Sequence, residues 1–348
     1  MAQINKPNLH FDSKIYLGSS NAVTVSGLGF QPDWVWVKDR DNGNDHCLVD
    51  AVRGVGKYIR ANSDGAEINN SSQSISAFTT DGFTTGTANP ANESASTTKG
   101  FISWNWKAGT GQGSSNTDGS INTTYTSVNT TAGFSISKYV GNYTAGATVG
   151  HGLGVAPKLI LIKNLTTAGR YWYVYHESLG NNTELYLNDS GTAPGSTGAW
   201  ETTSPTNQVF TLGDHNGVNQ NGNDHIAYCF AEKKGFSKFG SYTGNGNSSG
   251  NGPFVYTGFK PAWVIYKNKN AVYHWGMYDN KREPFNVCED LLFPNLANAE
   301  SNNDGRKIDM LSNGFKVRVT SDTNDINGSG NTIIYWAFAE NPLVGTNK

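Results

Sequence analysis

The sequence predicts an all-β protein made of three tandem antiparallel β-sandwich modules of the jelly-roll or lectin-like type. One ten-residue pattern occurs three times, the strand-like runs are short, and glycine-containing turns separate them. The pattern begins with Gly, has Pro at its fourth position and ends with Lys, at residues 29–38, 154–163 and 258–267. Its prolines, Pro32, Pro157 and Pro261, lie more than a hundred residues apart, so the repeating unit is a whole domain rather than a solenoid repeat.

The apolar run inside each copy predicts a strand that is buried on both faces. Trp, Val, Leu, Ile and Tyr fill residues 34–37, 159–162 and 263–266 without alternating with polar residues. A Pro just ahead of a strand removes no hydrogen bond that the sheet needs. The run is too short, and too rich in β-branched and aromatic residues, for a helix. Each module therefore has one central strand.

Further landmarks repeat around the central strand and set the module boundaries. Apolar strands close the copies at residues 101–108, 226–232 and 334–340. Asn-Gly, Asp-Gly and Gly-Asn turns separate the short strands within each copy. The predicted modules are 10–132, 133–235 and 236–348. Residues 109–131 are rich in Gly, Ser, Thr and Asn, which predicts a flexible linker or an extended loop at the end of the first module.

Composition excludes several classes of function. Charged residues make up 16% of the chain and the net charge is -2, so no basic surface is expected for nucleic acid. No apolar run is long enough to span a membrane, and residues 1–10 are polar, so we expect neither membrane insertion nor a signal peptide. The 3 cysteines lie far apart and fit synthesis in a reducing cytoplasm.

A loop after the first central strand is a candidate metal site. Asp39, Asp41 and Asp45 present oxygens at alternating positions, an arrangement that Ca²⁺ favours. Asp, Asn and Gly are also the residues that hairpin turns require, and the equivalent loops of the other two copies lack the acids. A calcium site and a plain turn both remain open interpretations.

The acidic residues and histidines do not predict an enzyme. A glycosidase needs two carboxylates that flank the scissile bond, whereas the acids here are scattered singly. Glu232 and Glu340 end their strands at equivalent positions, where we expect strand-end pairing with a nearby Lys. His46, His176 and His274 each follow a central strand at comparable distances. A structural position beside an aromatic strand is the better interpretation of these histidines, and a functional site is the alternative.

Aromatic residues outside the predicted strands are the candidate ligand-binding groups, because an aromatic ring offers a flat face to a sugar. Tryptophans inside the predicted strands are expected to pack in the core. The candidates for glycan contact are Tyr143, Tyr171, Trp172, Trp200 and Trp275.

Several ungapped strings resemble a repeat that is common in virion proteins of marine bacteriophages. These strings lie at residues 11–16 (FDSKIY), 29–38, 149–163, 226–232 (IAYCFAE), 238–246 and 337–342 (AFAENP). The resemblance covers nearly the whole chain. It implies a laminin-G-like or concanavalin-like jelly roll, often labelled tail-fibre-like, and it offers no catalytic residues to carry over.

The residues and the resemblance together predict a non-enzymatic virion protein of the tail-fibre or appendage type. It would bind a host-surface glycan through sandwich loops, and repeated weak sites would gain from multivalency. The alternative is a capsid-decorating or connector protein that binds no glycan; a polysaccharide hydrolase is disfavoured. The expected partners are other virion proteins, with a host-surface glycan and further copies of the chain as candidates. The three similar modules also permit a pseudo-threefold arrangement within one chain.

Overall fold

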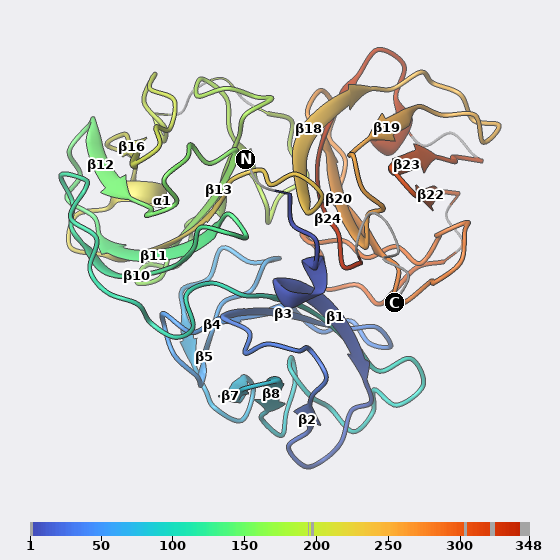
Figure 1. Ribbon diagram of the computed structural model, residues 1–348, viewed down its shortest axis with the longest axis horizontal. Helices are drawn as coiled ribbons and strands as arrows, with labels where there is room; N and C mark the ends of the chain where they lie inside the picture. The colour runs from blue at the N-terminus through green and yellow to red at the C-terminus, as the bar shows by residue number, and fades with distance from the viewer. Residues whose placement is uncertain (1–2, 194, 196–197, 303–304, 321–323, 342–348) are drawn as a thin grey trace.

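Short β-strands make up most of the regular structure (Figure 1). In this computed structural model, the described residues are 3–193, 195, 198–302, 305–320 and 324–341. Strands take up 37% and helices 3% of the chain, in several antiparallel sheets, none of which closes into a barrel within this described part. The predicted all-β class is confirmed. No helix among the described residues is long and apolar enough to cross a membrane.

Three lobes surround a common centre, and each lobe has one main sheet (Figure 1). We name them lobe 1 (residues 11–106), lobe 2 (123–230) and lobe 3 (237–338). The sheet of lobe 1 has the order β1 (Phe11–Tyr16), β9 (Phe101–Trp106), β3 (Trp34–Asp39) and β4 (Cys47–Asp50). Lobe 3 repeats this order with β18 (Ser237–Thr243), β24 (Thr332–Phe338), β20 (Trp263–Asn268) and β21 (Gly276–Asp279). Lobe 2 repeats it within a longer sheet of β10 (Thr123–Asn129), β11 (Phe134–Val140), β17 (Asp224–Phe230), β13 (Leu159–Asn164), β14 (Tyr173–His176) and β15 (Leu185–Tyr186).

Smaller sheets cover the outer side of each lobe. In lobe 1 they are β2 (Thr24–Val25), β8 (Gly82–Thr85) and β7 (Ile75–Thr79), with the separate pair β5 (Lys57–Tyr58) and β6 (Ile68–Asn69). In lobe 2 the pair is β12 (Ala147–Gly150) and β16 (Val209–Leu212). In lobe 3 they are β19 (Phe254–Tyr256), β23 (Gly314–Val317) and β22 (Ile308–Leu311). The short helices are η1 (Pro7–Leu9), α1 (Asn216–Asn219) and α2 (Asn324–Asn327).

The predicted central strands are β3, β13 and β20, and every residue in them is buried. Each lies between the closing strand and a further antiparallel strand, so both of its edges are hydrogen-bonded. Residues 109–131 differ from the predicted linker, because residues 123–129 form β10 and pair with β11. A polar, Thr-rich strand at a sheet edge has the composition of a loop, and this misled the sequence interpretation.

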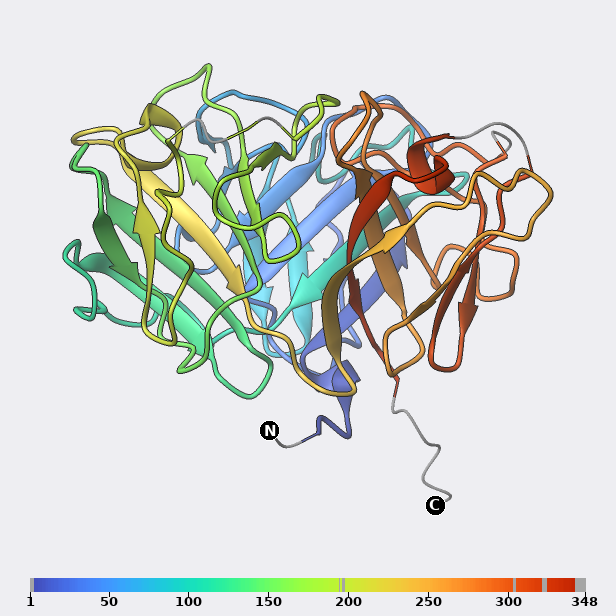
Figure 2. The same ribbon diagram turned by 90° about the horizontal axis from the view of Figure 1, so that it is seen from above.

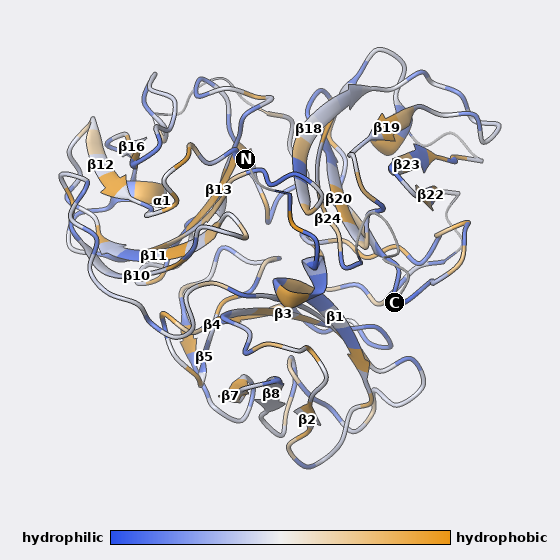
Figure 3. Ribbon diagram, viewed as in Figure 1, coloured by the Kyte–Doolittle hydropathy of each residue, from blue (hydrophilic) through white to orange (hydrophobic). Residues whose placement is uncertain are grey.

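The inner faces of the three main sheets share one hydrophobic core at the centre of the molecule. Rings from different lobes are in contact there: Trp34 lies 4.6 Å from Tyr228, and Trp106 lies 5.5 Å from Trp263, between ring centroids. Figure 3 shows hydrophobic residues on β13 and β20, which contribute to this core. The three segments therefore fold against one another instead of standing apart as beads on a string.

The outer face of each main sheet packs on the small sheets of its own lobe. Three separate clusters result, one in each lobe. Cys229 lies fully buried in the cluster of lobe 2, as a small core residue. Each lobe therefore has two layers, with its own outer core and a share in the central one.

Equivalent ring N–H groups join the lobes in a cycle. In each lobe, a residue with a buried aromatic ring comes directly before the strand that follows the central strand (β4, β14 and β21). A nitrogen of this ring lies 2.8–3.0 Å from a backbone carbonyl oxygen of the neighbouring lobe. The pairs are His46 with Phe293, Trp172 with Arg60, and Trp275 with Tyr186. Because Nδ1 of His46 accepts a hydrogen bond from Trp36, its Nε2 carries the proton and donates. His46 is thus structurally equivalent to two tryptophans, and not to His176 or His274.

A second set of hydrogen bonds joins the same pairs of lobes, across the boundaries that we call seams. The hydroxyl of Tyr228 donates to Asp50 at 2.7 Å, and Nε1 of Trp104 donates to Asp279 at 3.2 Å. His176, which occupies the corresponding register position in lobe 2, lies 3.1 Å from the carbonyl oxygen of Tyr335. His46 and His176 therefore contact neighbouring lobes, whereas His274 lies 2.8 Å from Asn295 of its own lobe.

The pattern's closing lysines, Lys38, Lys163 and Lys267, are buried at the end of the central strands. Each ammonium donates to backbone carbonyls, including that of the next residue. Burial lowers the pKa of each of them to about 8. Figure 2 shows the N-terminal segment at the opposite end of the molecule, where β24 also ends. The pockets described below lie at that end.

Candidate functional site

The loop predicted as a calcium site does not bring its carboxylates together. Both oxygens of Asp39 accept hydrogen bonds, Oδ1 from the backbone of Asp41 and Asn42, and Oδ2 from Asn44 Nδ2 at 2.7 Å and Ser96 Oγ at 2.5 Å. A carboxylate that is already surrounded by donors has no lone pairs directed at a cation.

The other two acids of this loop point to different partners. Asp41 accepts from the backbone N–H groups of residues 98–100. Asp45 pairs with Arg60 at 3.1 Å and accepts from Asn62 at 2.7 Å. No group of three or more His, Cys, Asp or Glu side chains suited to a metal occurs in the described ranges. Of the two interpretations left open by the sequence, the turn describes how Asp39, Asp41 and Asp45 lie in the structure.

Three of the predicted aromatic ligand-binding residues are buried. Trp172 and Trp275 lie fully inside the central core, where they form the seam hydrogen bonds given above. Trp200 is buried in the outer core of lobe 2, with its ring centroid 5.7 Å from that of Tyr175. None of these three rings offers a face to a ligand, so these predictions are wrong. A residue outside a predicted strand can still be buried, because the two layers of a lobe can close over the loop that carries it.

Tyr143 and Tyr171 are exposed, as predicted. Tyr143 sits in a loop at a positive φ of 57°. Tyr171 stacks on Tyr186 at 4.7 Å between ring centroids. Neither ring lines either of the two pockets described in this article. Both remain candidates as isolated surface rings.

A pocket of about 410 Å³ lies where lobe 2 passes into lobe 3. Its walls come from the loop after β17, the start of β18 and the end of β19. The side chains that line it carry an aromatic ring, a carboxylate, ammonium groups and hydroxyls, from Glu232, Lys233, Lys234, Ser237, Lys238, Tyr256 and Thr257. A concave site with one aromatic wall and a few polar groups is the usual form of a small-ligand pocket.

Tyr256 supplies the aromatic wall, and 63% of its surface is exposed. It ends β19, a three-residue strand in which Phe254 and Tyr256 face outwards and Val255 faces the core. Gly258, at a φ of +83°, turns the chain beside this ring, and a Cβ there would come within 3.5 Å of the tyrosine hydroxyl. Sequence reasoning missed Tyr256, because Phe-Val-Tyr is short and shows no alternation of apolar and polar residues.

Glu232 supplies the carboxylate. Its Oε1 accepts a hydrogen bond from Lys238 Nζ at 2.9 Å. Its Oε2 is buried and has no hydrogen-bond partner within the described part of the protein. The equivalent Glu340 pairs with Lys281. The predicted strand-end pairing of Glu232 and Glu340 with lysines is therefore confirmed, and Glu232 keeps one acceptor oxygen unused.

Comparison with protein-family models matches residues 6–342 to one family, described as a domain of unknown function (DUF7483). The chain belongs to the DUF7483 family. No curated protein and no solved structure matches it. Because the match spans all three lobes, the DUF7483 unit is the whole three-lobed arrangement rather than one lobe.

The pocket of this DUF7483 chain combines one aromatic ring with one carboxylate and several ammonium and hydroxyl groups. Glu232 is the only carboxylate among the residues that line it, so the second carboxylate of a glycosidase pair is missing from the described lining. An exposed ring in one lining with ammonium groups and hydroxyls suits a polyhydroxylated ligand, whose C–H face packs on the ring and whose hydroxyls donate and accept.

Proposed function

We propose that this DUF7483 chain is a non-enzymatic bacteriophage virion protein of the tail-fibre or appendage type, which binds a host-surface glycan in the Tyr256 pocket. The resemblance to repeats of marine phage virion proteins supports the virion part of the proposal. The exposed ring of Tyr256, in one lining with hydroxyl, ammonium and carboxylate side chains, is the observation that supports the glycan part. Other virion proteins are the expected partners.

We further propose that each lobe is one β-sandwich module of the jelly-roll type, with boundaries near 10–132, 133–235 and 236–348. The shared strand order of the three main sheets and the separate outer core of each lobe support this interpretation. The cyclic contacts across the seams support a pseudo-threefold relation between the modules.

Replacing Tyr256 by alanine is expected to weaken glycan binding by at least about tenfold. An aromatic contact contributes about 0.5–1.5 kcal/mol beyond the area it buries, and 1.4 kcal/mol corresponds to tenfold in affinity. The measurement is equilibrium binding of the full chain to an array of bacterial surface polysaccharides and to purified lipopolysaccharide. Because the ring is mostly exposed, thermal unfolding of the variant should match that of the wild type.

The matched control is Tyr171→Ala, which removes an exposed tyrosine ring in lobe 2 that lies outside the pocket. It should leave the affinity within twofold of the wild-type value. Equal binding by the wild type and Tyr256→Ala would refute the assignment of the site. Release of reducing ends from the polysaccharide by the wild type would refute the non-enzymatic part.

The second candidate function is a capsid-decorating or connector protein. The pseudo-threefold arrangement of a single chain favours it, because such a unit fits a site of local threefold symmetry. Copy number per virion, measured by quantitative mass spectrometry against the major capsid protein, separates the two. A few to a few dozen copies would support the appendage, and hundreds would support the decoration. Absence from purified particles would refute both.

A further inference from the structure

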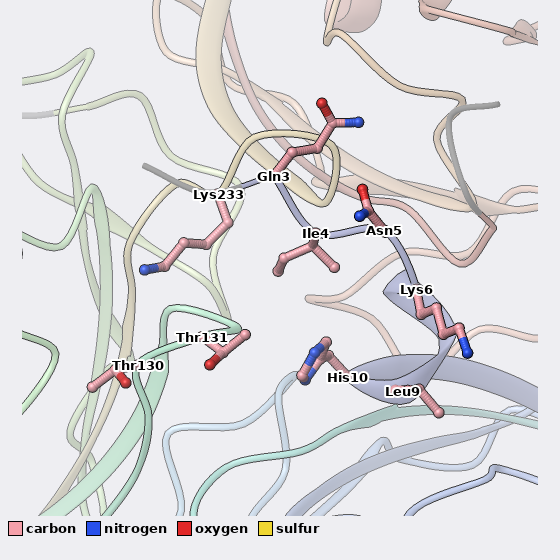
Figure 4. A pocket seen from close by; sticks show the side chains of 9 residues that line it. All are labelled: Gln3, Ile4, Asn5, Lys6, Leu9, His10, Thr130, Thr131 and Lys233. Atoms are coloured by element: carbon pink, nitrogen blue, oxygen red, sulfur yellow. The ribbon is translucent and has the colours of Figure 1, made fainter.

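A second pocket, of about 360 Å³, lies beside the N-terminal segment (Figure 4). This segment runs between the lobes, and the amide of Ile4 donates to the carbonyl of Lys234 at 3.1 Å. The pocket is lined by Gln3, Ile4, Asn5, Lys6, Leu9, His10, Thr130, Thr131 and Lys233. Lys233 lines both this pocket and the Tyr256 pocket, so one side chain links the two.

The lining of this second pocket combines cationic and polar side chains with the apolar Ile4 and Leu9, and it contains no carboxylate. Lys6, Lys233 and His10 supply up to three positive charges, while Thr130 and Thr131 supply hydroxyl donors. Lys6 and Lys233 form no ion pair with a carboxylate of the described residues. The buried Arg40, Arg53 and Arg282 are by contrast paired with carboxylates.

Lys233 is held in place and is partly removed from water. Its Cε and Cγ lie so close to Gly133 that a Cβ there would come within 2.8 and 3.0 Å of them. Desolvation lowers the pKa of Lys233, and burial together with the charge of Lys107 lowers the pKa of His10. An anion in the pocket would replace the lost hydration of both groups. Figure 4 shows Lys233, Thr131 and His10 around one open space.

We propose that the second pocket binds an anionic oxygen group, namely the phosphate, sulfate or carboxylate of an acidic glycan whose neighbouring sugar lies in the Tyr256 pocket. Lys233 would contact the anion, with His10 as a further donor and the threonine hydroxyls completing the shell. The ammonium of Lys6 points away from this space, on the far side of Ile4 (Figure 4). The Tyr256 pocket alone does not distinguish neutral from acidic sugars, and the second pocket would add that selectivity. The glycan part of this inference rests on the proposed function, whereas the anion site itself does not.

The test of the anion site uses inorganic phosphate and inorganic sulfate with the full chain at low ionic strength. Titration calorimetry is expected to detect weak binding that added sodium chloride reverses. Lys233→Gln and Thr131→Val should each weaken phosphate binding at least fivefold. Lys57→Gln, which removes a half-exposed ammonium from lobe 1, should leave it within twofold. Thermal unfolding of each variant checks that it is folded, and the two pocket variants provide independent readings.

A second arm uses matched polysaccharides with and without phosphate or uronic acid groups. Acidic forms should bind the wild type at least tenfold more tightly than neutral forms, and Lys233→Gln should remove this preference. Phosphate binding without any glycan binding would support the anion site and refute the proposed function. Neutral and acidic glycans bound equally, with Lys233→Gln unchanged, would refute this inference while the proposed function stands. Failure of phosphate and sulfate to bind would also overturn it.

Discussion

Replacing Glu300 by glutamine is expected to lower the free energy of unfolding by about 3 kcal/mol or more at pH 7. The Glu300 carboxylate is fully buried between lobes 1 and 3. Its oxygens accept hydrogen bonds from Arg40 of lobe 1 at 2.8 and 3.0 Å, and from Arg282 of lobe 3 at 3.0 Å. The neutral amide leaves two buried guanidinium groups with less counter-charge, and the cost of an uncompensated buried charge is large.

The pKa of Glu300 agrees with this role. Burial alone would raise the pKa, but the hydrogen bond from Arg40 and the charge of Arg282 lower it to about 2. A carboxyl whose pKa is lower in the folded state stabilises the fold above its unfolded pKa and ceases to do so as the pH falls towards 2. Glu300→Gln should therefore lose most of its effect relative to the wild type in strong acid.

Urea denaturation of wild type, Glu300→Gln and a control variant measures this effect. The control is Glu177→Gln, which breaks the exposed pair between Glu177 and Lys158, where the Glu side chain is 52% exposed. An exposed pair contributes about 1 kcal/mol or less. Equal stability of Glu300→Gln and Glu177→Gln would contradict the account of the seam between lobes 1 and 3.

Acidification from pH 7 to pH 5 is expected to lower the free energy of unfolding by a few kcal/mol. Burial lowers the pKa of His46 to about 3, and those of His176 and His225 to about 4. The unfolded chain takes up protons near pH 6.5 that the folded chain does not bind, so stability falls as the pH is lowered. Each of these histidines contributes up to about 2 kcal/mol between pH 6.5 and pH 5.

Two carboxyl groups oppose this loss. Burial raises the pKa of Glu340 to about 7 and that of Asp290 to about 6, so both bind protons more readily in the folded state. Their protonation stabilises the fold as the pH falls, but they are fewer than the histidines. The three histidines therefore determine the direction of the net change.

The measurement combines denaturation at pH 7.5 and pH 5.0 with imidazole NMR. The signals of His46 and His176 should not titrate between these two values in the folded protein. Stability that is unchanged or greater at pH 5.0 would contradict the predicted direction. Imidazole signals that titrate near pH 6.5 would show that the rings of His46 and His176 are not held in the neutral form by their hydrogen bonds between lobes.

The sequence was sufficient for the framework of the fold. The Pro-led apolar runs predicted β3, β13 and β20, because a strand buried on both faces has few residue types available to it. The repeat predicted the equivalence of Glu232 and Glu340 and their lysine partners. The sequence did not reveal that the three main sheets pack face to face, and this is why Trp172 and Trp275 were misplaced on the surface. Burial depends on contacts between segments more than a hundred residues apart.

The candidate site was harder to predict for a related reason. Tyr256 lies in a strand of three residues, and a run this short gives almost no periodic signal. Its partners Glu232 and Lys238 come from the junction between two lobes, and only the packing of β19 beside β18 brings them together. Asp39 looks like a calcium ligand in the sequence but lies in a turn in the structure. The same Asp and Asn residues that ligate Ca²⁺ also close a hairpin turn.

Aromatic NMR of the full chain, titrated with polysaccharide from a susceptible host, tests the central claim most directly. With tyrosine rings labelled, assignment by single Tyr→Phe variants identifies the signals of Tyr256, Tyr171 and Tyr143. The account predicts that Tyr256 shifts on binding while the other two rings stay unchanged. Saturating binding that leaves Tyr256 unmoved, or that shifts Tyr171 or Tyr143 instead, would contradict it.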